Sequence, residues 1–164
     1  LYTSSILALD PKTGKITWHY QTLPNDPFDH DGVNEIVHAT IDGRKVVMQA
    51  SRNGFYYVLD AATGELVAAN KFVEKVNWAD GIDLATGRPN DTDVTTKARA
   101  GEEVEYWPGA LGGKNWLPTA YNPNTQTTSI NTINDGTNDK ALEQQYRPAV
   151  LYLRPECSSS WCRK

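Results

Sequence analysis

The stretch Ile6-Leu7-Ala8-Leu9-Asp10-Pro11-Lys12-Thr13-Gly14-Lys15-Ile16-Thr17-Trp18 decides the fold of this chain. An apolar run, a turn containing Pro and Gly, and a second alternating run form the signature of a β-hairpin. Asp10 can accept hydrogen bonds from the turn amides, and Gly14 can adopt the positive φ that closes the turn. We therefore predict that these residues are structural.

The same pattern returns further along the chain. Residues 56–67, Tyr-Tyr-Val-Leu-Asp-Ala-Ala-Thr-Gly-Glu-Leu-Val, repeat it in type, with Asp60 and Gly64 at the turn. Weaker copies occur at residues 82–88 and 121–126, and the second of these has Gln126 in place of the turn glycine. A repeat of strands and turns with a period of roughly 40 to 50 residues is typical of a β-propeller, in which each blade buries its faces against its neighbours.

One blade is visible in full between the first two turns. Residues 34–40 and 45–50 are strand-like, and Asp42-Gly43 between them is a hairpin signal. No run shows helical periodicity over three turns. We therefore predict an all-β fold that contains about two to three blades of a propeller.

Composition excludes several classes of protein. The chain has 164 residues and a net charge of −4, so no basic stripe is available for nucleic acid, and no apolar run is long enough to span a bilayer. It begins at Leu1 without a leader, which indicates a piece of a longer protein. Cys157 and Cys162 are its only cysteines and allow either a local disulfide or two free thiols.

The last part of the chain differs from the rest. From about Thr128 the strand alternation is lost, and residues 157–164 are rich in serine. We predict a propeller segment over residues 1–127 and a separate tail over residues 128–164. The tail is open to three explanations: a divergent insertion, a disordered tail or the product of a reading-frame error.

An acidic loop follows the first hairpin. Residues 24–34, Pro-Asn-Asp-Pro-Phe-Asp-His-Asp-Gly-Val-Asn, contain three carboxylates among turn formers. With a bend at His30, the oxygens of Asp29 and Asp31 can converge on one hard cation, which prefers several oxygen ligands. The alternative is a solvated turn, because these residue types are common in turns. We expect Asp26 to serve turn structure.

A series of short motifs occurs in a fixed order along residues 1–127. The series resembles the pyrroloquinoline quinone (PQQ) dependent alcohol and methanol dehydrogenases, which are eight-bladed periplasmic quinoproteins, and the element from Asp10 to Trp18 resembles their tryptophan-docking motif. The other motifs are Trp18-His19-Tyr20-Gln21, Pro24-Asn25-Asp26, Phe28-Asp29-His30-Asp31-Gly32-Val33-Asn34-Glu35, Ser51-Arg52-Asn53-Gly54-Phe55, Val76-Asn77-Trp78 and Gly112-Gly113-Lys114-Asn115-Trp116.

The resemblance implies roles for individual residues. Asp29 matches the catalytic aspartate, which is a metal ligand and the general base, and Asp31 matches a second metal ligand that is an aspartate in lanthanide-dependent members. Arg52 matches the cation beside the quinone, Asn115 matches an amide that contacts the cofactor, and Trp116 helps to wall the site. The implied cofactors are PQQ and a lanthanide ion, with Ca²⁺ as the alternative, because a second carboxylate suits a trivalent ion.

The expected chemistry is oxidation of a primary alcohol to an aldehyde by hydride transfer to metal-bound PQQ, with Asp29 taking the proton. The resemblance further implies a periplasmic location and cytochrome c as the electron acceptor, and leaves an oligomer possible. The alternative is a non-catalytic propeller used for protein binding or outer-membrane assembly. Asp29, Arg52 and Asn115 favour the enzyme, although the segment alone lacks the family's other metal ligands and its vicinal cysteines.

The remaining candidates have structural interpretations. His19, His30 and His38 share no metal-ligand spacing and are expected to be surface or packing residues. Trp18 is expected to anchor one blade against the next. Trp78 is left without a predicted role.

Overall fold

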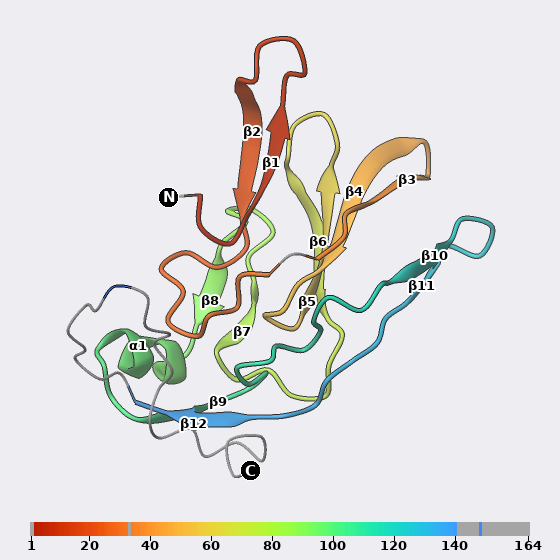
Figure 1. Cartoon of the computed structure of the whole chain (residues 1–164). Coiled ribbons are helices and arrows are strands. Elements are labelled where there is room, and N and C mark those ends of the chain that lie inside the picture. The colour runs from red at the N-terminus through yellow and green to blue at the C-terminus, as the bar shows by residue number, and fades with distance from the viewer. Residues whose placement is uncertain (1, 33, 141–147, 149–164) are drawn as a thin grey trace.

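The computed structural model shows a chain built from small antiparallel sheets and describes residues 2–32, 34–140 and 148 (Figure 1). The largest sheet has the strand order β3-β4-β5-β6, made of β3 (Val37–Ile41), β4 (Arg44–Ala50), β5 (Phe55–Asp60) and β6 (Leu66–Lys71). The other sheets have two strands each: β1 (Ser5–Leu9) with β2 (Ile16–Gln21), β7 (Ala79–Ile82) with β8 (Pro89–Asp91), β9 (Val104–Tyr106) with β12 (Thr137–Asp139), and β10 (Ala120–Asn122) with β11 (Thr127–Ser129).

The four-stranded sheet confirms the predicted blade. Strands β3 and β4 meet at the Asp42-Gly43 turn, where Ile41 pairs with Arg44. Both turn residues have positive φ, 50° at Asp42 and 81° at Gly43, as a two-residue hairpin of matching twist requires. The first strand begins at Val37, three residues later than the sequence pattern indicates.

Alternation along β5 places one face of the blade in the core. Phe55, Tyr57 and Leu59 are buried, while the residues between them are partly exposed. Trp78 packs edge-on against Phe55, with 5.6 Å between ring centroids, and its indole Nε1 donates to the carbonyl of Asn53 at 2.8 Å. Trp78 is completely buried, so its role is in the core rather than in a site.

The repeated turns are built alike. In the first, the carboxylate of Asp10 accepts from the amides of Lys12 and Thr13 at 2.7 and 3.0 Å, and the Gly14 amide donates to the carbonyl of Asp10. Equivalent bonds form at Asp60 and Asp83. The prediction that the Asp and Gly residues of the turns are structural is confirmed.

Aromatic side chains of β2 join the hairpins to one another. Trp18 lies against Gly64, where an added Cβ would come within 2.6 Å of the indole, and its Nε1 donates to the carbonyl of Ala61 at 3.2 Å. The hydroxyl of Tyr20 donates to the carbonyl of Gly87 at 2.9 Å. The expected anchoring role of Trp18 is confirmed, and Tyr20 plays a similar one.

The predicted all-β class is confirmed, and the one helix among the described residues, α1, spans Asp93–Arg99. This helix has seven residues, too few for a periodic pattern over three turns. Asp93 in its first turn and Arg99 in its last suit the helix dipole, and the hydroxyl of Thr95 fixes it to the carbonyl of Trp78 at 2.6 Å. The chain is therefore mostly β, and no helix in the described part of the chain is long and apolar enough to cross a membrane.

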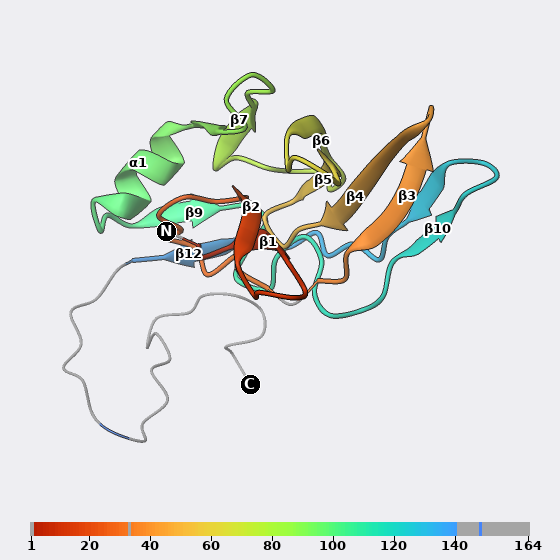
Figure 2. The same cartoon turned by 90° about the horizontal axis from the view of Figure 1, so that it is seen from above.

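The described fold continues beyond residue 127. Strand β11 crosses this position, and β12 pairs with β9 on the other side of the molecule (Figure 2). The amide of Gly109 also donates to the carbonyl of Asp135 at 2.7 Å. The division into a propeller segment and a tail stays a prediction, and Cys157 and Cys162 lie outside the described residues.

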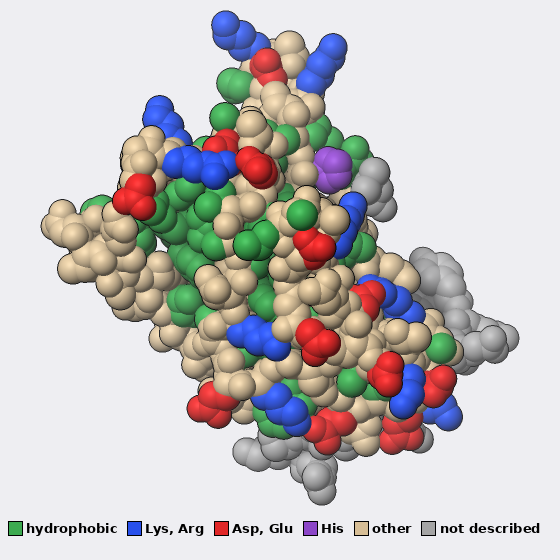
Figure 3. Space-filling view, turned by 180° about the vertical axis from the view of Figure 1, so that it is seen from behind, with side chains coloured by type: hydrophobic (Ala, Val, Ile, Leu, Met, Phe, Trp, Pro, Cys, Tyr) green, Lys and Arg blue, Asp and Glu red, His purple; other side chains and the backbone are tan. Residues whose placement is uncertain are grey.

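Apolar side chains gather on one part of the surface. Figure 3 shows hydrophobic side chains over the middle of the back face, with basic and acidic side chains both at its upper tips and, mixed, over its lower part. Leu7, Leu9 and Ile16 of the β1–β2 hairpin are among the exposed large apolar residues. Exposed apolar strand faces of this kind are what propeller blades bury against one another.

Candidate functional site

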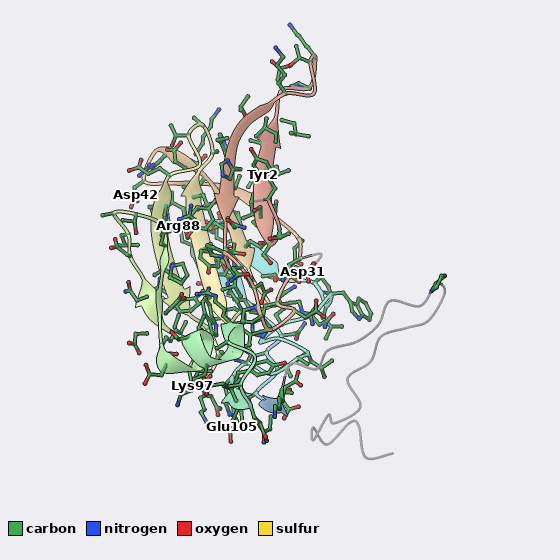
Figure 4. The ribbon with its side chains drawn as sticks, turned by 90° about the vertical axis from the view of Figure 1, so that its left-hand side faces the viewer. Tyr2, Asp31, Asp42, Arg88, Lys97 and Glu105 are labelled. Carbon is green, nitrogen blue, oxygen red and sulfur yellow. The ribbon has the colours of Figure 1, made fainter. Side chains whose placement is uncertain are left out.

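Four of the five predicted site residues line one hollow of about 510 Å³, and the fifth, Asp29, is not among its lining residues. Asp31, Arg52, Asn115 and Trp116 reach it from three separate segments, and the remaining lining residues are Ser4, Gly32 and Asn34. In Figure 4, Asp31 lies at the opposite edge of the view from Asp42 and Arg88. The hollow is therefore formed by loops away from the tip of the β3–β4 hairpin.

Asp26 shapes the acidic loop. One of its carboxylate oxygens accepts from the amide of Phe28 at 2.8 Å, and the other accepts from the amide of His30 at 2.7 Å. The hydroxyl of Ser4 also donates to this carboxylate, at 3.4 Å. Asp26 therefore serves turn structure, as expected.

His30 anchors the acidic loop from inside. Its side chain is buried, and its Nε2 lies 3.1 Å from the carbonyl oxygens of both Pro108 and Gly109. Two carbonyl acceptors place the ring proton on Nε2, and burial lowers the pKa of His30. The prediction of a surface or packing role is confirmed for His30 as packing, but no sequence pattern indicated this anchor, because its partners lie 78 and 79 residues away.

Asp29 and Asp31 lie side by side. Asp29 has φ of 60°, a left-handed conformation that is uncommon for a non-glycine residue. Burial raises the pKa of Asp29, as do its hydrogen bond to Asp31 and the charge of Asp31, while Arg52 acts in the opposite direction. Two adjacent carboxylates repel each other when both are ionised, so the pair is a place where a cation would be stabilised.

Arg52 joins the acidic loop to the loop that carries Asn115. Its Nη1 donates to the carbonyl of Asp31 at 2.8 Å, and its Nη2 donates to the carbonyl of Ala110 at 2.5 Å. The side-chain stem lies between two glycines: a Cβ on Gly112 would come within 2.7 Å of Arg52 Cβ, and a Cβ on Gly32 would collide with Arg52 Cδ. These glycines therefore leave the room that the Arg52 side chain occupies, and the two hydrogen bonds hold its guanidinium.

The turn that holds Arg52 is fixed by its neighbour Asn53. The side chain of Asn53 is completely buried, its Nδ2 donates to the hydroxyl of Tyr57 at 2.8 Å, and its Oδ1 accepts from the amide of Phe55 at 3.1 Å. Asn53 was not among the predicted site residues. Its position in an Asn-Gly turn beside Arg52 was the one available signal.

Asn115 and Trp116 form the other rim of the hollow. The side chain of Asn115 donates to the carbonyl of Leu111 at 3.2 Å and accepts from the amide of Trp116 at 2.9 Å. Asn115 thus closes its own loop. Trp116 is 75% exposed, so its indole is free to contact a molecule in the hollow.

The residues present fit part of a metal and quinone site. Asp29 and Asp31 are hard oxygen donors, but a hard cation such as Ca²⁺ takes about six to eight oxygens, and no group of three or more His, Cys, Asp or Glu side chains in residues 2–32, 34–140 and 148 could hold a metal. The Nε of Arg52 is buried without a hydrogen-bond partner among these residues. An anionic or carbonyl-bearing ligand would suit this cation and the amide of Asn115.

Comparison with known proteins also indicates a β-propeller fold. The family described as PQQ glucose/ethanol/alcohol dehydrogenase, beta-propeller domain, matches residues 1–76. The quinohemoprotein alcohol dehydrogenase ADH IIB of Pseudomonas putida is 47% identical over 129 residues, which are 76% of this chain and 18% of that protein.

Solved structures agree with this match. The quinohemoprotein alcohol dehydrogenase ADHIIG of Pseudomonas putida HK5 superposes with a TM-score of 0.78 and 36% identity, over 90% of this chain and 22% of that one. A europium-containing methanol dehydrogenase superposes with a TM-score of 0.79 and 34% identity, over 89% of this chain and 26% of that one.

The fold and the loops around the hollow define a segment of a β-propeller domain. The chain is homologous to part of the PQQ-dependent quinoprotein alcohol dehydrogenases. It spans about a fifth of the length of the curated relatives it matches.

Proposed function

We propose that this chain is part of a periplasmic PQQ-dependent dehydrogenase that oxidises primary alcohols to aldehydes. The observation that carries the proposal is the hollow itself, which gathers Asp31, Arg52, Asn115 and Trp116 from three distant segments. Its support from homology is the match to PQQ enzymes over most of the chain. A propeller used only for protein binding has no need of two adjacent carboxylates beside a fixed arginine.

Asp29, which contacts Asp31, and the residues that line the hollow have complementary tasks. PQQ, when bound, supplies the carbonyl carbon that accepts hydride from the alcohol carbon. Asp29 takes the proton of the alcohol hydroxyl, so that the C–H electron pair and the O–H proton leave together and an aldehyde remains. Burial and Asp31 raise the pKa of Asp29, and Arg52 opposes this rise; a cation held by the two carboxylates would favour the ionised form that this step requires. Asn115 and Trp116 would hold the cofactor at the rim.

Asp29 and Asp31 are the proposed metal ligands, and the proposed ion is a lanthanide, with Ca²⁺ as the alternative. Two carboxylates from one loop cancel more positive charge than one does, which suits a trivalent ion. That a europium-containing methanol dehydrogenase is among the similar structures supports this proposal. Transfer of the electrons to a cytochrome c is proposed from the same resemblance.

The complete protein that carries this segment allows a direct test. It is reconstituted with PQQ and either calcium or lanthanum, and alcohol-dependent reduction of a dye is measured. We expect activity with lanthanum above that with calcium. Absence of activity with both ions would overturn the proposal.

Replacing Asp31 separates the two metals. Asp31→Ala is expected to lower lanthanum-supported activity by roughly 100-fold or more, since loss of even an outer-shell partner of a metal ligand costs about 10- to 100-fold, and to leave any calcium-supported activity largely intact. Asp80→Ala is the matched control, because Asp80 is an exposed carboxylate on β7, away from the residues that line the hollow. Equal losses with both ions would show that Asp31 does not select the metal.

A further inference from the structure

An ion pair between a buried lysine, Lys114, and a partly exposed glutamate, Glu35, lies next to residues that line the hollow. The side chain of Lys114 is completely buried, and its Nζ donates to Glu35 Oε2 at 2.9 Å and to the carbonyl of Asn115 at 3.1 Å. Glu35 follows the acidic loop, and Lys114 precedes Asn115 and Trp116 in sequence. The pair therefore connects the two loops that face each other across the hollow.

Glu35 holds the loop of residues 114–119 at two points. Besides Lys114, its other carboxylate oxygen accepts from the amide of Thr119 at 2.5 Å. One carboxylate thus reaches both ends of residues 114–119, with Asn115 and Trp116 between the two contacts. Each loop also has a hydrogen bond to the blade or to the turn that follows it. The side-chain amide of Gln49 donates to the carbonyl of Asn34 at 3.0 Å, and the backbone amide of Gly113 donates to the carbonyl of Arg52 at 2.7 Å.

Stability alone does not account for an ion pair in this place. Removing a lysine from water is costly, and an ion pair that buries a charge often contributes no more stability than two apolar side chains of similar size. The pair orients the groups that it joins, because each of its hydrogen bonds fixes an angle as well as a distance. The segment oriented in this way is the one that carries Asn115 and Trp116.

We propose that Glu35 and Lys114 are positioning residues which set Asn115 and Trp116 at the correct distance from Asp31 and Arg52. The role of Asn115 and Trp116 rests on the proposed function. The ion pair of Glu35 and Lys114 with its hydrogen bonds, called the brace below, is a property of this chain whatever its function. Its effect on loop motion can therefore be measured with no cofactor present.

Hydrogen exchange in the complete protein tests the brace directly. In Lys114→Met, the amides of Asn115, Trp116, Leu117 and Thr119 are expected to exchange about tenfold faster, while those of β4 and β5 keep their rates, because only the local opening is made easier. Lys75→Met is the matched control: it removes an ion pair of the same chemistry, Lys75 with Glu105 at 3.2 Å, between half-exposed side chains. Equal rates over residues 115–119 in the two variants would overturn the proposal.

Cofactor binding provides the second readout. The dissociation constant of PQQ, measured by quenching of tryptophan fluorescence, is expected to rise about tenfold in Lys114→Met, as is common for residues that orient site groups, and to stay unchanged in Lys75→Met. If wild-type protein does not bind PQQ, the proposed function fails, and the exchange rates still decide the brace.

A double variant separates positioning from folding. Glu35→Leu with Lys114→Met leaves no unpaired charge, so it is expected to unfold close to the wild-type temperature even if Lys114→Met alone does not fold. It should still show fast exchange over residues 115–119 and weak PQQ binding. Wild-type exchange and wild-type PQQ affinity in the double variant would show that the pair positions nothing.

Discussion

The repeated turns and the loops around the hollow are held together in different ways. Each turn is fixed by its own residues: the carboxylate of Asp10, Asp60 or Asp83 accepts from amides two and three positions later. The loops of the hollow contain little regular structure and are fixed from far away. Arg52 reaches Asp31 and Ala110 across 21 and 58 residues.

The difference separates conformations that the local sequence sets from conformations that tertiary contacts set. A turn that closes on itself forms the same way wherever its sequence occurs, so it can be repeated along the chain. The loops of the hollow take their shape only when the surrounding sheets are assembled. Substitutions in the turns and in the loops should therefore have different consequences.

The largest expected effect comes from a turn that also touches a neighbouring sheet. Gly64→Ala is expected to lower the free energy of unfolding by roughly 2–6 kcal/mol, because alanine is strained at φ of 75° and its Cβ would collide with Trp18. Gly14→Ala is the control, since Gly14 has φ of 69° with open space around it, and it should cost only about 1–2 kcal/mol. Denaturant unfolding measures both, and equal losses would mean that the contact with Trp18 contributes nothing.

Removing His30 should loosen the acidic loop. His30→Ala is expected to cost about 2–4 kcal/mol, because it leaves a cavity and deprives the carbonyls of Pro108 and Gly109 of a donor. His19→Ala is the control, as this histidine is exposed on β2. Thermal unfolding that is the same in both variants would contradict the anchoring role of His30.

Glu35 should make stability depend on acid pH. Burial raises the pKa of Glu35, but hydrogen bonds from Thr119 and Lys114 lower it by more, so that the pKa falls from 4.5 to about 2. A lowered pKa means that the stabilisation is complete above pH 4.5 and is lost as the pH falls toward 2. The difference in unfolding free energy between wild type and Glu35→Gln should therefore shrink over this range.

Asp10 is the carboxylate in a turn that corresponds to Glu35, because its hydrogen-bond donors lie only two and three residues away. Hydrogen bonds from the amides of Lys12 and Thr13 lower its pKa as well, but Asp10→Asn keeps an oxygen acceptor for the same amides. Its stability should follow that of wild type more closely than Glu35→Gln does between pH 7 and pH 3. A larger effect at Asp10 would reverse the comparison between turn and loop.

The smallest expected effect is that of the single hydroxyl which joins β2 to the third turn. Tyr20→Phe removes the bond to the carbonyl of Gly87 and is expected to cost about 1 kcal/mol, visible as a small fall in the melting temperature. The ring contact stays in place. A loss above about 3 kcal/mol would show that this hydroxyl contributes more than one ordinary hydrogen bond.

The parts of the fold that the sequence predicted are those with local causes. The hairpins at Gly14 and Gly64, the Asp42-Gly43 turn and the anchoring of Trp18 follow from residue types at fixed spacing. Helix α1 was missed, because its seven residues are fewer than a periodic pattern needs. Strand β12 was missed as well, because its pairing with β9 joins residues about thirty positions apart.

The candidate site divides in the same way. Resemblance of short motifs selected Asp29, Asp31, Arg52, Asn115 and Trp116, and the structure places all of them except Asp29 around one hollow. The resemblance assigned no role to His30, Asn53 or the pair of Glu35 and Lys114. These residues act through partners that only the folded chain brings near, and their side chains look ordinary in the sequence.

The sequence by itself determined the blade, its turns and the chemical types available to a site, because a turn or a strand depends on neighbouring residues. The tertiary structure alone decided that the acidic loop and the loop of Asn115 face each other. The physical reason is that their contacts are hydrogen bonds and an ion pair across 21 to 84 residues, which no local pattern specifies.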